Sequence, residues 1–229
     1  MSQSGQSGNG NSIVWPPNQA ISWVDDFFPN DVTLTDFGQL IWQGISGNVT
    51  EVSGNSAHPG QLQFTNGGGG SGICLADDPT VYPIVLGGGN WEVNFVVSLN
   101  TLSTLADRYT ANAGLMDNLV QDGVPNNGVY LSYSDNVNSG KWLLVCKSGG
   151  VATTVDSGIT ATTGWVNLGF KVNPSASSVS FTINGAPVGS AITTNIPSAV
   201  VGPGLNFIGF VTNSLLDLFY MRFTATTPR

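Results

Sequence analysis

Carboxylates are the first residues to consider for chemistry, because pairs of them hydrolyse glycosidic bonds. The chain contains two glutamates, Glu51 and Glu92. A retaining glycosidase needs two carboxyl groups about 5–5.5 Å apart, which same-face positions of one strand can supply. Neither glutamate has an acidic residue two or four positions away. The sequence therefore predicts no catalytic residues of this kind, and we expect the protein not to be an enzyme.

Histidine and cysteine offer little further chemistry. His58 is the only histidine, and no Ser-Asp constellation lies near it in the sequence, so it supports neither a zinc site with several histidines nor a Ser-His-Asp triad. The two cysteines, Cys74 and Cys146, lie in apolar stretches. We favour two buried free thiols, with a disulfide between them as the alternative. No cofactor is expected.

Several acidic and amide residues could instead hold a hard cation or a sugar. Adjacent carboxylates occur at Asp25-Asp26 and Asp77-Asp78, and Asp77 and Asp78 with a loop carbonyl could serve as calcium ligands. Asp135 with Asn136 and Asn138 lies in a predicted hairpin loop that could bind calcium or sugar. Aspartate and asparagine at such places commonly bond backbone amides in turns. We therefore expect no metal site.

Composition excludes other classes of function. The 229 residues include 30 glycines, only 9% are charged, and the formal net charge is −8. Glutamate and lysine are nearly absent, which argues against an all-α fold. The six Lys and Arg residues cannot neutralise a phosphate backbone, so no nucleic-acid partner is expected. No apolar run approaches the roughly 18 residues of a membrane span, so no membrane partner is expected either.

From about Asp25 onward, apolar residues recur with the period of two that is typical of strands. The pair Asn184-Gly185 is a two-residue hairpin signal. Residues 102–107 could form a single helical turn. The candidate strands are 39–44, 48–53, 61–65, 72–76, 91–99, 109–115, 128–134, 141–147, 151–156, 165–172, 178–183, 186–188, 206–211 and 216–224. So many short strands between turns predict an all-β, two-sheet antiparallel jelly-roll sandwich.

Strand and turn segments carry a resemblance to a known fold family. In the second half these segments are 128–133, 138–142, 165–172, 179–185 and 194–197. In the first half, matching order and spacing are found at Asp25-Asp-Phe27, Gly38 with Trp42, His58-Pro-Gly60, and Arg108-Tyr109 with Gly114-Leu115. Over residues 24–224 the chain resembles the concanavalin A-like (laminin-G-type) jelly-roll domains of bacteriophage virion proteins. These motifs are structural, so the resemblance implies the fold more strongly than any activity.

The resemblance implies a structural protein of a virion surface, either a capsid decoration protein or a small appendage, assembled in the host cytoplasm. Its implied partners are capsid or tail proteins of the same virion and further copies of itself, with a trimer favoured. One alternative is a tail-fibre module that binds a carbohydrate receptor. Another is a polysaccharide-degrading enzyme on the same fold, although the Glu-x-Asp-x-Glu pattern of sandwich glucanases is absent.

The N-terminal segment lies outside the resemblance. Residues 1–12 are rich in Gly, Ser, Gln and Asn, lack the basic and apolar regions of a secretory signal peptide, and should be flexible. An apolar stretch follows. We interpret residues 1–23 as a flexible arm before a jelly-roll domain at 24–229, docking on its own domain or on a partner. The candidate anchor residues are Ile13, Trp15, Pro16 and Trp23.

Exposed aromatic rings and amide side chains are the features that would bind host-surface or environmental glycans. Trp165 shares a strand face with Asn167 and Lys171, which indicates a surface position. Tyr130 and Tyr133 point to opposite faces of their strand, so at most one of them is available for stacking. The candidate glycan-binding residues are Trp165, Tyr133, Asp135, Asn138 and Asn167.

Overall fold

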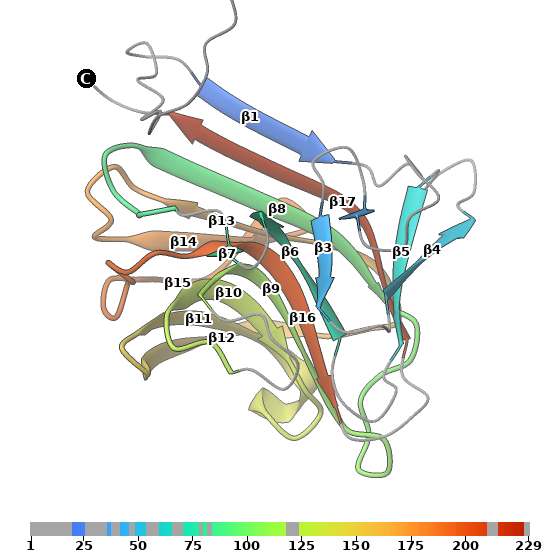
Figure 1. Ribbon diagram of the computed structural model, residues 1–229. Helices are drawn as coiled ribbons and strands as arrows, with labels where there is room; N and C mark the ends of the chain where they lie inside the picture. Colours follow the sequence, from blue (N-terminus) through green and yellow to red (C-terminus); the bar gives the residue numbers. More distant parts are fainter. Residues whose placement is uncertain are drawn as a thin grey trace, which may run out of the picture.

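The computed structural model describes residues 20–25, 36–37, 42–45, 49–53, 60–65, 71–77, 80–81, 84–117, 124–209 and 215–226. These residues form two antiparallel sheets packed face to face (Figure 1). The all-β jelly-roll sandwich predicted from the sequence is confirmed, and every candidate strand overlaps a strand of the structure.

The first sheet, sheet A, has eight strands. In spatial order they are β15 (Ala186–Ile192), β14 (Val179–Ile183), β13 (Gly164–Val172), β8 (Asn90–Leu99), β17 (Leu215–Thr226), β5 (Gly60–Thr65) and β4 (Val49–Ser53), with β1 (Ala20–Asp25) also paired to β17. The long central strands β8 and β17 lie side by side, and β17 is flanked by β1 over one half and by β5 over the other.

The second sheet, sheet B, has nine strands. In spatial order they are β12 (Val151–Thr160), β11 (Lys141–Ser148), β10 (Gly128–Tyr133), β9 (Tyr109–Met116), β16 (Gly202–Gly209), β6 (Ser71–Asp77), β3 (Trp42–Ile45) and β2 (Asp36–Phe37), with β7 (Thr80–Val81) paired to β6. A single 3-10 turn, η1 (Asn138–Gly140), precedes β11.

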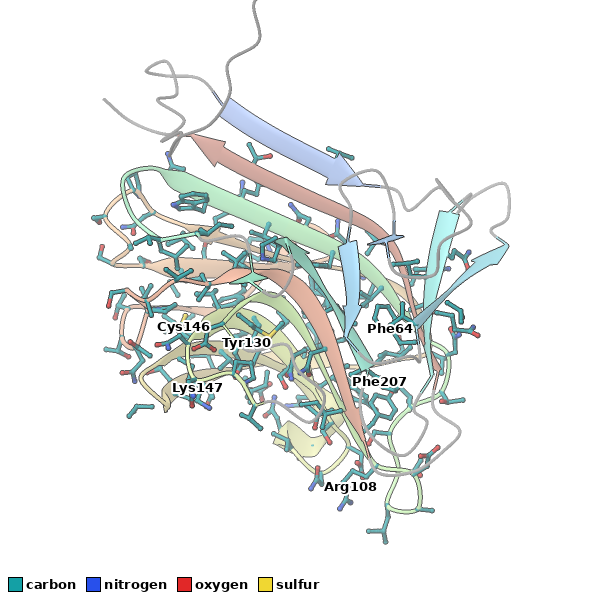
Figure 2. The ribbon with its side chains drawn as sticks, in the orientation of Figure 1. Phe64, Arg108, Tyr130, Cys146, Lys147 and Phe207 are labelled. Atoms are coloured by element: carbon teal, nitrogen blue, oxygen red, sulfur yellow. The ribbon has the colours of Figure 1, made fainter. Side chains whose placement is uncertain are left out.

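The core lies between the two sheets and follows the period of two. Phe64 of sheet A and Phe207 of sheet B are both fully buried (Figure 2). On β13 and β14 the rings of Phe170 and Phe181 pack at a centroid distance of 5.9 Å. Burial of such side chains is the main contribution that holds the sheets together.

Cys146 is a free thiol in this core with no exposed surface. Burial raises its pKa to about 12, so the thiol stays protonated and unreactive. The preferred interpretation of a buried free cysteine is confirmed for Cys146. The backbone of Cys74 lies in β6, and its side chain is outside the described residues.

Two local predictions need correction. Residues 102–107 form bends rather than a helical turn, because Thr104 closes the segment on itself. The Thr104 N–H donates to the Asp107 carbonyl, and the Asp107 N–H donates to Thr104 Oγ1, each at 3.1 Å. Such side-chain bonds compete with helix formation. The short strands β2 and β7 were not predicted, since two residues show no periodicity.

The strand β1 begins inside the segment that we interpreted as an arm. Its backbone pairs with β17 of the same chain, with Trp23 opposite Phe223. For residues 20–25 the structure therefore shows the alternative in which the segment docks on its own domain. The other anchor candidates, Ile13, Trp15 and Pro16, lie outside the described residues.

The edge strand β12 is closed by side-chain hydrogen bonds. The Gly158 N–H donates to Asp156 Oδ1 at 2.7 Å, and the Ile159 N–H donates to Ser157 Oγ at 3.1 Å. Asn195, which follows β15 of the other sheet, donates to Thr153 Oγ1 at 2.9 Å. Edge strands that leave their polar groups open invite pairing with another chain, and here several of these groups are already occupied.

Two glycines test how closely the strands are packed. A Cβ on Gly114 of β9 would contact the Val129 carbonyl and lie 2.6 Å from Tyr130 Cα, both backbone atoms. A Cβ on Gly169 of β13 would lie 2.5 Å from Asn94 Oδ1 and 2.6 Å from Thr182 Oγ1, both atoms of side chains that can rotate. We expect Gly114→Ala to lower the free energy of unfolding by about 1–3 kcal/mol and Gly169→Ala by clearly less. Urea denaturation measures both, and equal losses would contradict this account of the packing.

Candidate functional site

Two loops meet at one end of the sandwich. Residues 100–108 connect β8 of sheet A to β9 of sheet B, and residues 134–140 connect β10 to β11 within sheet B. Arg108 lies at this end, at the start of β9 (Figure 2). The pairing of β9 with β10, which extends to Ala111 opposite Tyr133, brings the two loops together, and beyond that point side chains fix their relative position.

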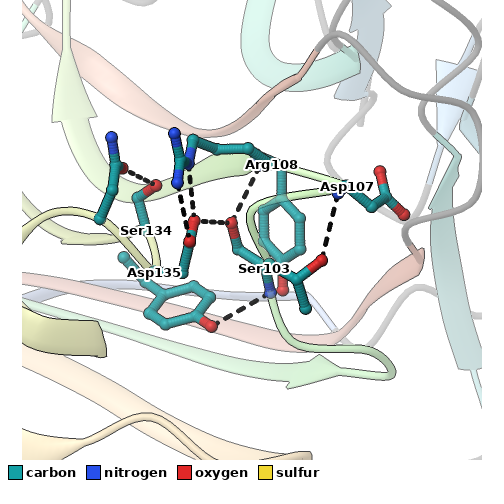
Figure 3. A network of polar contacts seen from close by, with 9 residues as sticks. Ser103, Asp107, Arg108, Ser134 and Asp135 are labelled. Atoms are coloured by element: carbon teal, nitrogen blue, oxygen red, sulfur yellow. Dashed lines mark hydrogen bonds and ion pairs between the residues drawn. The ribbon is translucent and has the colours of Figure 1, made fainter.

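The Asp135 carboxylate joins the two loops (Figure 3). Its Oδ1 accepts hydrogen bonds from Ser103 Oγ at 2.6 Å and from Arg108 Nε at 3.0 Å. Its Oδ2 accepts a further bond from Arg108 Nη2 at 3.1 Å. This two-point geometry between guanidinium and carboxylate fixes orientation as well as distance.

Ser103 connects this ion pair to the core beneath it. Its side chain is buried, and its Oγ accepts a hydrogen bond from the Tyr109 N–H at 3.0 Å. Its own N–H donates to the Tyr133 hydroxyl at 3.1 Å. The Tyr133 ring in turn packs edge-on against Tyr109 at 5.7 Å and against Trp142 at 5.6 Å. The loops therefore rest on a platform of buried aromatic rings.

The electrostatics of the pair agree with its geometry. The hydrogen bond from Arg108 lowers the pKa of Asp135, and the same bond raises the pKa of Arg108. A carboxyl group whose pKa is lowered on folding stabilises the folded state above its unfolded pKa of about 3.9. That contribution is lost as the pH falls through the lowered value. Asp135 is thus ionised at neutral pH and is a poor general acid.

A surface cavity of about 310 Å³ opens beside this network. Small-molecule sites in proteins begin at about this size. Leu105 and Val137 at the cavity are 83% and 43% exposed, so the lining presents aliphatic surface to solvent. The lining residues that matter for recognition are Leu105, Ala106, Arg108, Asn136, Val137 and Ile208.

The structure brings only part of the predicted glycan-binding set to this cavity. Asp135 lies in the network beside it. The expectation for Tyr133 is wrong: it shares the inward face of β10 with Val129 and Leu131, is 3% exposed, and has no free face for a sugar. Its position in the alternation, two residues after Leu131, could have indicated this.

Asn138 is held in a turn instead. It adopts a left-handed backbone with φ of 52°, which asparagine tolerates, and its amide donates to Asp156 Oδ1 at 3.0 Å. Lys141 Nζ donates to the other Asp156 oxygen at 3.0 Å. Bonds from the Gly158 N–H, Lys141 and Asn138 lower the pKa of Asp156 to about 2. This loop is a structural turn with its charges satisfied internally.

Trp165 and Asn167 lie on β13 of sheet A. Their Cα partners on β8 are Ser98 and Val96, close to where β8 leads into the 100–108 loop. Both side chains are partly exposed. The Asn167 N–H donates to Asn184 Oδ1 at 2.9 Å, which ties β13 to the β14–β15 hairpin. These two residues therefore form a second candidate surface, separate from the described lining of the cavity.

Sequence reasoning missed the residues that shape the cavity. Arg108 entered only as part of a fold resemblance, and Asn136 only as a neighbour of Asp135 in a loop that could bind calcium or sugar. Leu105 and Val137 gave no signal. The clue that the sequence offered was an arginine in a chain with few cations, followed 27 residues later by an aspartate in a predicted loop. Among the described residues, no group of three or more His, Cys, Asp or Glu side chains lies together. Within the same residues, no helix has the length and apolar character needed to cross a membrane.

The family described as "SO2946-like, C-terminal domain" matches residues 57–215, which is more than half of the chain. The chain belongs to this family. No curated protein matches it. The family description carries no reference to a virion, so the bacteriophage part of the resemblance stays a prediction.

Solved structures agree with the fold. Peanut lectin, determined with a 9mer peptide, has a TM-score of 0.59 at 13% identity, covering 92% of this chain and 99% of the lectin. Bacillus licheniformis beta-glucanase has a TM-score of 0.57 at 16% identity, with coverages of 91% and 98%. A carbohydrate esterase from the Shiga toxin-encoding bacteriophage phi24B has a TM-score of 0.50 at 12% identity, with coverages of 82% and 90%. The fold is thus the concanavalin A-like jelly roll of lectins and glucanases.

The role of Ser103 in holding the loops can be tested by substitution. Ser103→Ala leaves the buried Tyr109 N–H without its acceptor and removes one donor from Asp135. We expect the free energy of unfolding to fall by about 1–3 kcal/mol. Ser180→Ala, at an exposed position on β14, is the matched control and should change it by less than about 0.5 kcal/mol. Equal effects in chemical denaturation would show that the network does not contribute.

Proposed function

We propose that the protein is a non-enzymatic, lectin-like carbohydrate-binding domain whose ligand site is the cavity beside Arg108 and Asp135. The observation that carries the proposal is that an open cavity combines exposed aliphatic walls with a guanidinium held in one orientation. A sugar has apolar C–H faces and directional hydroxyl groups, so it needs both kinds of contact at fixed positions.

The polar groups of the cavity suit a ligand rich in hydroxyl groups. Asp135 takes the Nε and one Nη2 bond of Arg108, which leaves further N–H donors on a side chain that is 39% exposed. The Asn136 Oδ1 accepts from Ser134 Oγ at 2.9 Å, and this bond sets the orientation of the amide. Because these groups are already positioned, binding costs little ordering entropy.

The described carboxylates support binding rather than hydrolysis. Asp135 is paired with Arg108, Asp156 with Lys141 and Glu92 with Lys171, at 3.0–3.1 Å. A glycosidase acid needs a raised pKa, whereas the pKa values of Asp135 and Asp156 are both lowered. The side chain of Glu51 lies outside the described residues. A polysaccharide-degrading enzyme is therefore the less favoured alternative.

For the biological setting we propose a virion surface, as a capsid decoration protein or small appendage attached through the N-terminal segment. The apolar residues Ile13, Trp15 and Pro16 precede a strand that already belongs to the sandwich, so the attached portion would be residues 1–19. Capsid or tail proteins would be the partners, with a trimer as the favoured assembly and a tail-fibre receptor-binding module as the alternative. Among similar folds, the bacteriophage phi24B carbohydrate esterase supports such a setting.

Carbohydrate binding is tested by a glycan array followed by titration of the hits. We expect Asn136→Ala and Leu105→Ser to weaken binding by about tenfold, because each removes one contact worth roughly 1–1.5 kcal/mol. Val151→Ser, at an exposed valine outside the described cavity lining, should leave the affinity unchanged. A blank array would overturn carbohydrate binding. Hits that are lost on Trp165→Ala but not on Asn136→Ala would place the site on sheet A instead.

Attachment is tested by deleting residues 1–19, which leaves β1 in place. We expect a soluble domain with the melting temperature of the full chain that no longer incorporates into particles in which the full chain is found. Because β1 pairs with β17, a deletion of residues 1–25 should also lower the melting temperature. Normal incorporation of the shorter deletion would contradict attachment through this segment.

A further inference from the structure

We propose that the cavity selects neutral sugars that carry an acetamido group, with the methyl group against Leu105 and Val137 and the amide group at Arg108 and Asn136. This inference rests on the proposed carbohydrate binding and specifies its ligand class. It follows from three properties of the described lining: its charge, its apolar walls and its hydrogen-bonding groups.

The charge of the site favours a neutral ligand. Arg108 is the charged side chain of the described lining, and its charge is balanced by Asp135. The neighbouring residue in the chain, Asp107, adds a negative charge, and the whole chain carries −8. The charge of Arg108 is already balanced by Asp135, and the surrounding protein is negatively charged. An acidic sugar would therefore gain little binding free energy from the guanidinium.

The walls of the cavity favour a methyl group over a flat sugar face. Leu105, Ala106, Val137 and Ile208 are aliphatic, and the aromatic residue of the described lining, Tyr109, is only 1% exposed. Sugar rings stack on exposed aromatic faces, and this lining offers none. Aliphatic walls instead gain from burying a compact apolar group such as the methyl of an acetamide.

The polar groups of the lining favour a ligand with a strong acceptor. Arg108 keeps N–H donors that Asp135 does not use, and the Asn136 amide adds the donors of Nδ2. The side-chain acceptors of the described lining are fewer: Asn136 Oδ1 already takes the Ser134 hydroxyl, and Ser134 and Thr110 contribute one hydroxyl oxygen each. An acetamide carbonyl supplies the acceptor that these donors need, and its single N–H can bond to Thr110 or Asn136.

The test compares matched sugars on the purified full chain. Titrations with N-acetylglucosamine and N-acetylgalactosamine are set against glucose, galactose and glucuronate. We expect each acetamido sugar to bind about tenfold more tightly than its parent hexose, since it adds one buried methyl and one hydrogen bond. Saturation-transfer NMR should show its strongest signal at the acetyl methyl protons.

Two variants separate the methyl contact from general effects. Val137→Ser should reduce the preference for acetamido sugars to about twofold or less while hexose binding is kept. Val151→Ser, an exposed valine on β12, should keep the full preference. If sugars bind in an Asn136-dependent way with no acetamido preference, or glucuronate binds best, this inference fails and the proposed function stands. If no sugar binds at all, both fail.

Discussion

A single carboxylate holds the functional end of this sandwich together. Asp135 follows β10 and receives bonds from Ser103 and Arg108 of the loop that leads into β9, the strand paired with β10. The pairing of β9 with β10 brings the two loops together, and the ion pair fixes the side chains beyond the strand ends in one arrangement. The pair is anchored in turn, because Ser103 bonds to Tyr109 and Tyr133, whose rings belong to the core. The packing of these aromatic rings therefore holds the two surface loops in fixed positions.

The chain has few charged residues, and three of its described carboxylates are held in ion pairs. Each of the ion-paired carboxylates Asp135, Asp156 and Glu92 has its cation within about 3 Å. Groups used up in this way orient loops and strands, and they are poorly suited to exchange protons with a substrate. A concanavalin A-like sandwich supports both lectins and glucanases, so the fold alone leaves that choice open. The ion pairs of Asp135, Asp156 and Glu92 are the observation that supports the proposed binding function.

The sequence was sufficient to predict the fold, because alternation in β8 and β13 and the Asn184-Gly185 hairpin signal reflect local physics. In the structure both hairpin residues have positive φ, 51° and 77°, as a two-residue turn of this type requires. The candidate site was harder to predict from the sequence than the fold. Arg108 and Asp135 come together because β9 and β10 pair within sheet B, which places the residues just beyond the two strand ends next to each other. A pairing between strands is not encoded in a local pattern. Tyr133 is buried because it lies on the inward face of β10, two residues after Leu131. Trp23 was assigned to an arm because β1 is recognisable only through its partner β17.

The closed edge of β12 has a consequence for contacts between copies of the domain. A chain with few charged residues places few charged side chains along its sheet edges, and such edges ordinarily let one sheet grow into the next. Here Asp156, Ser157 and Asn195 occupy groups of the β12 edge with bonds internal to the chain. Where β12 faces another copy of the domain, these bonds disfavour the continuation of sheet B from one molecule into the next.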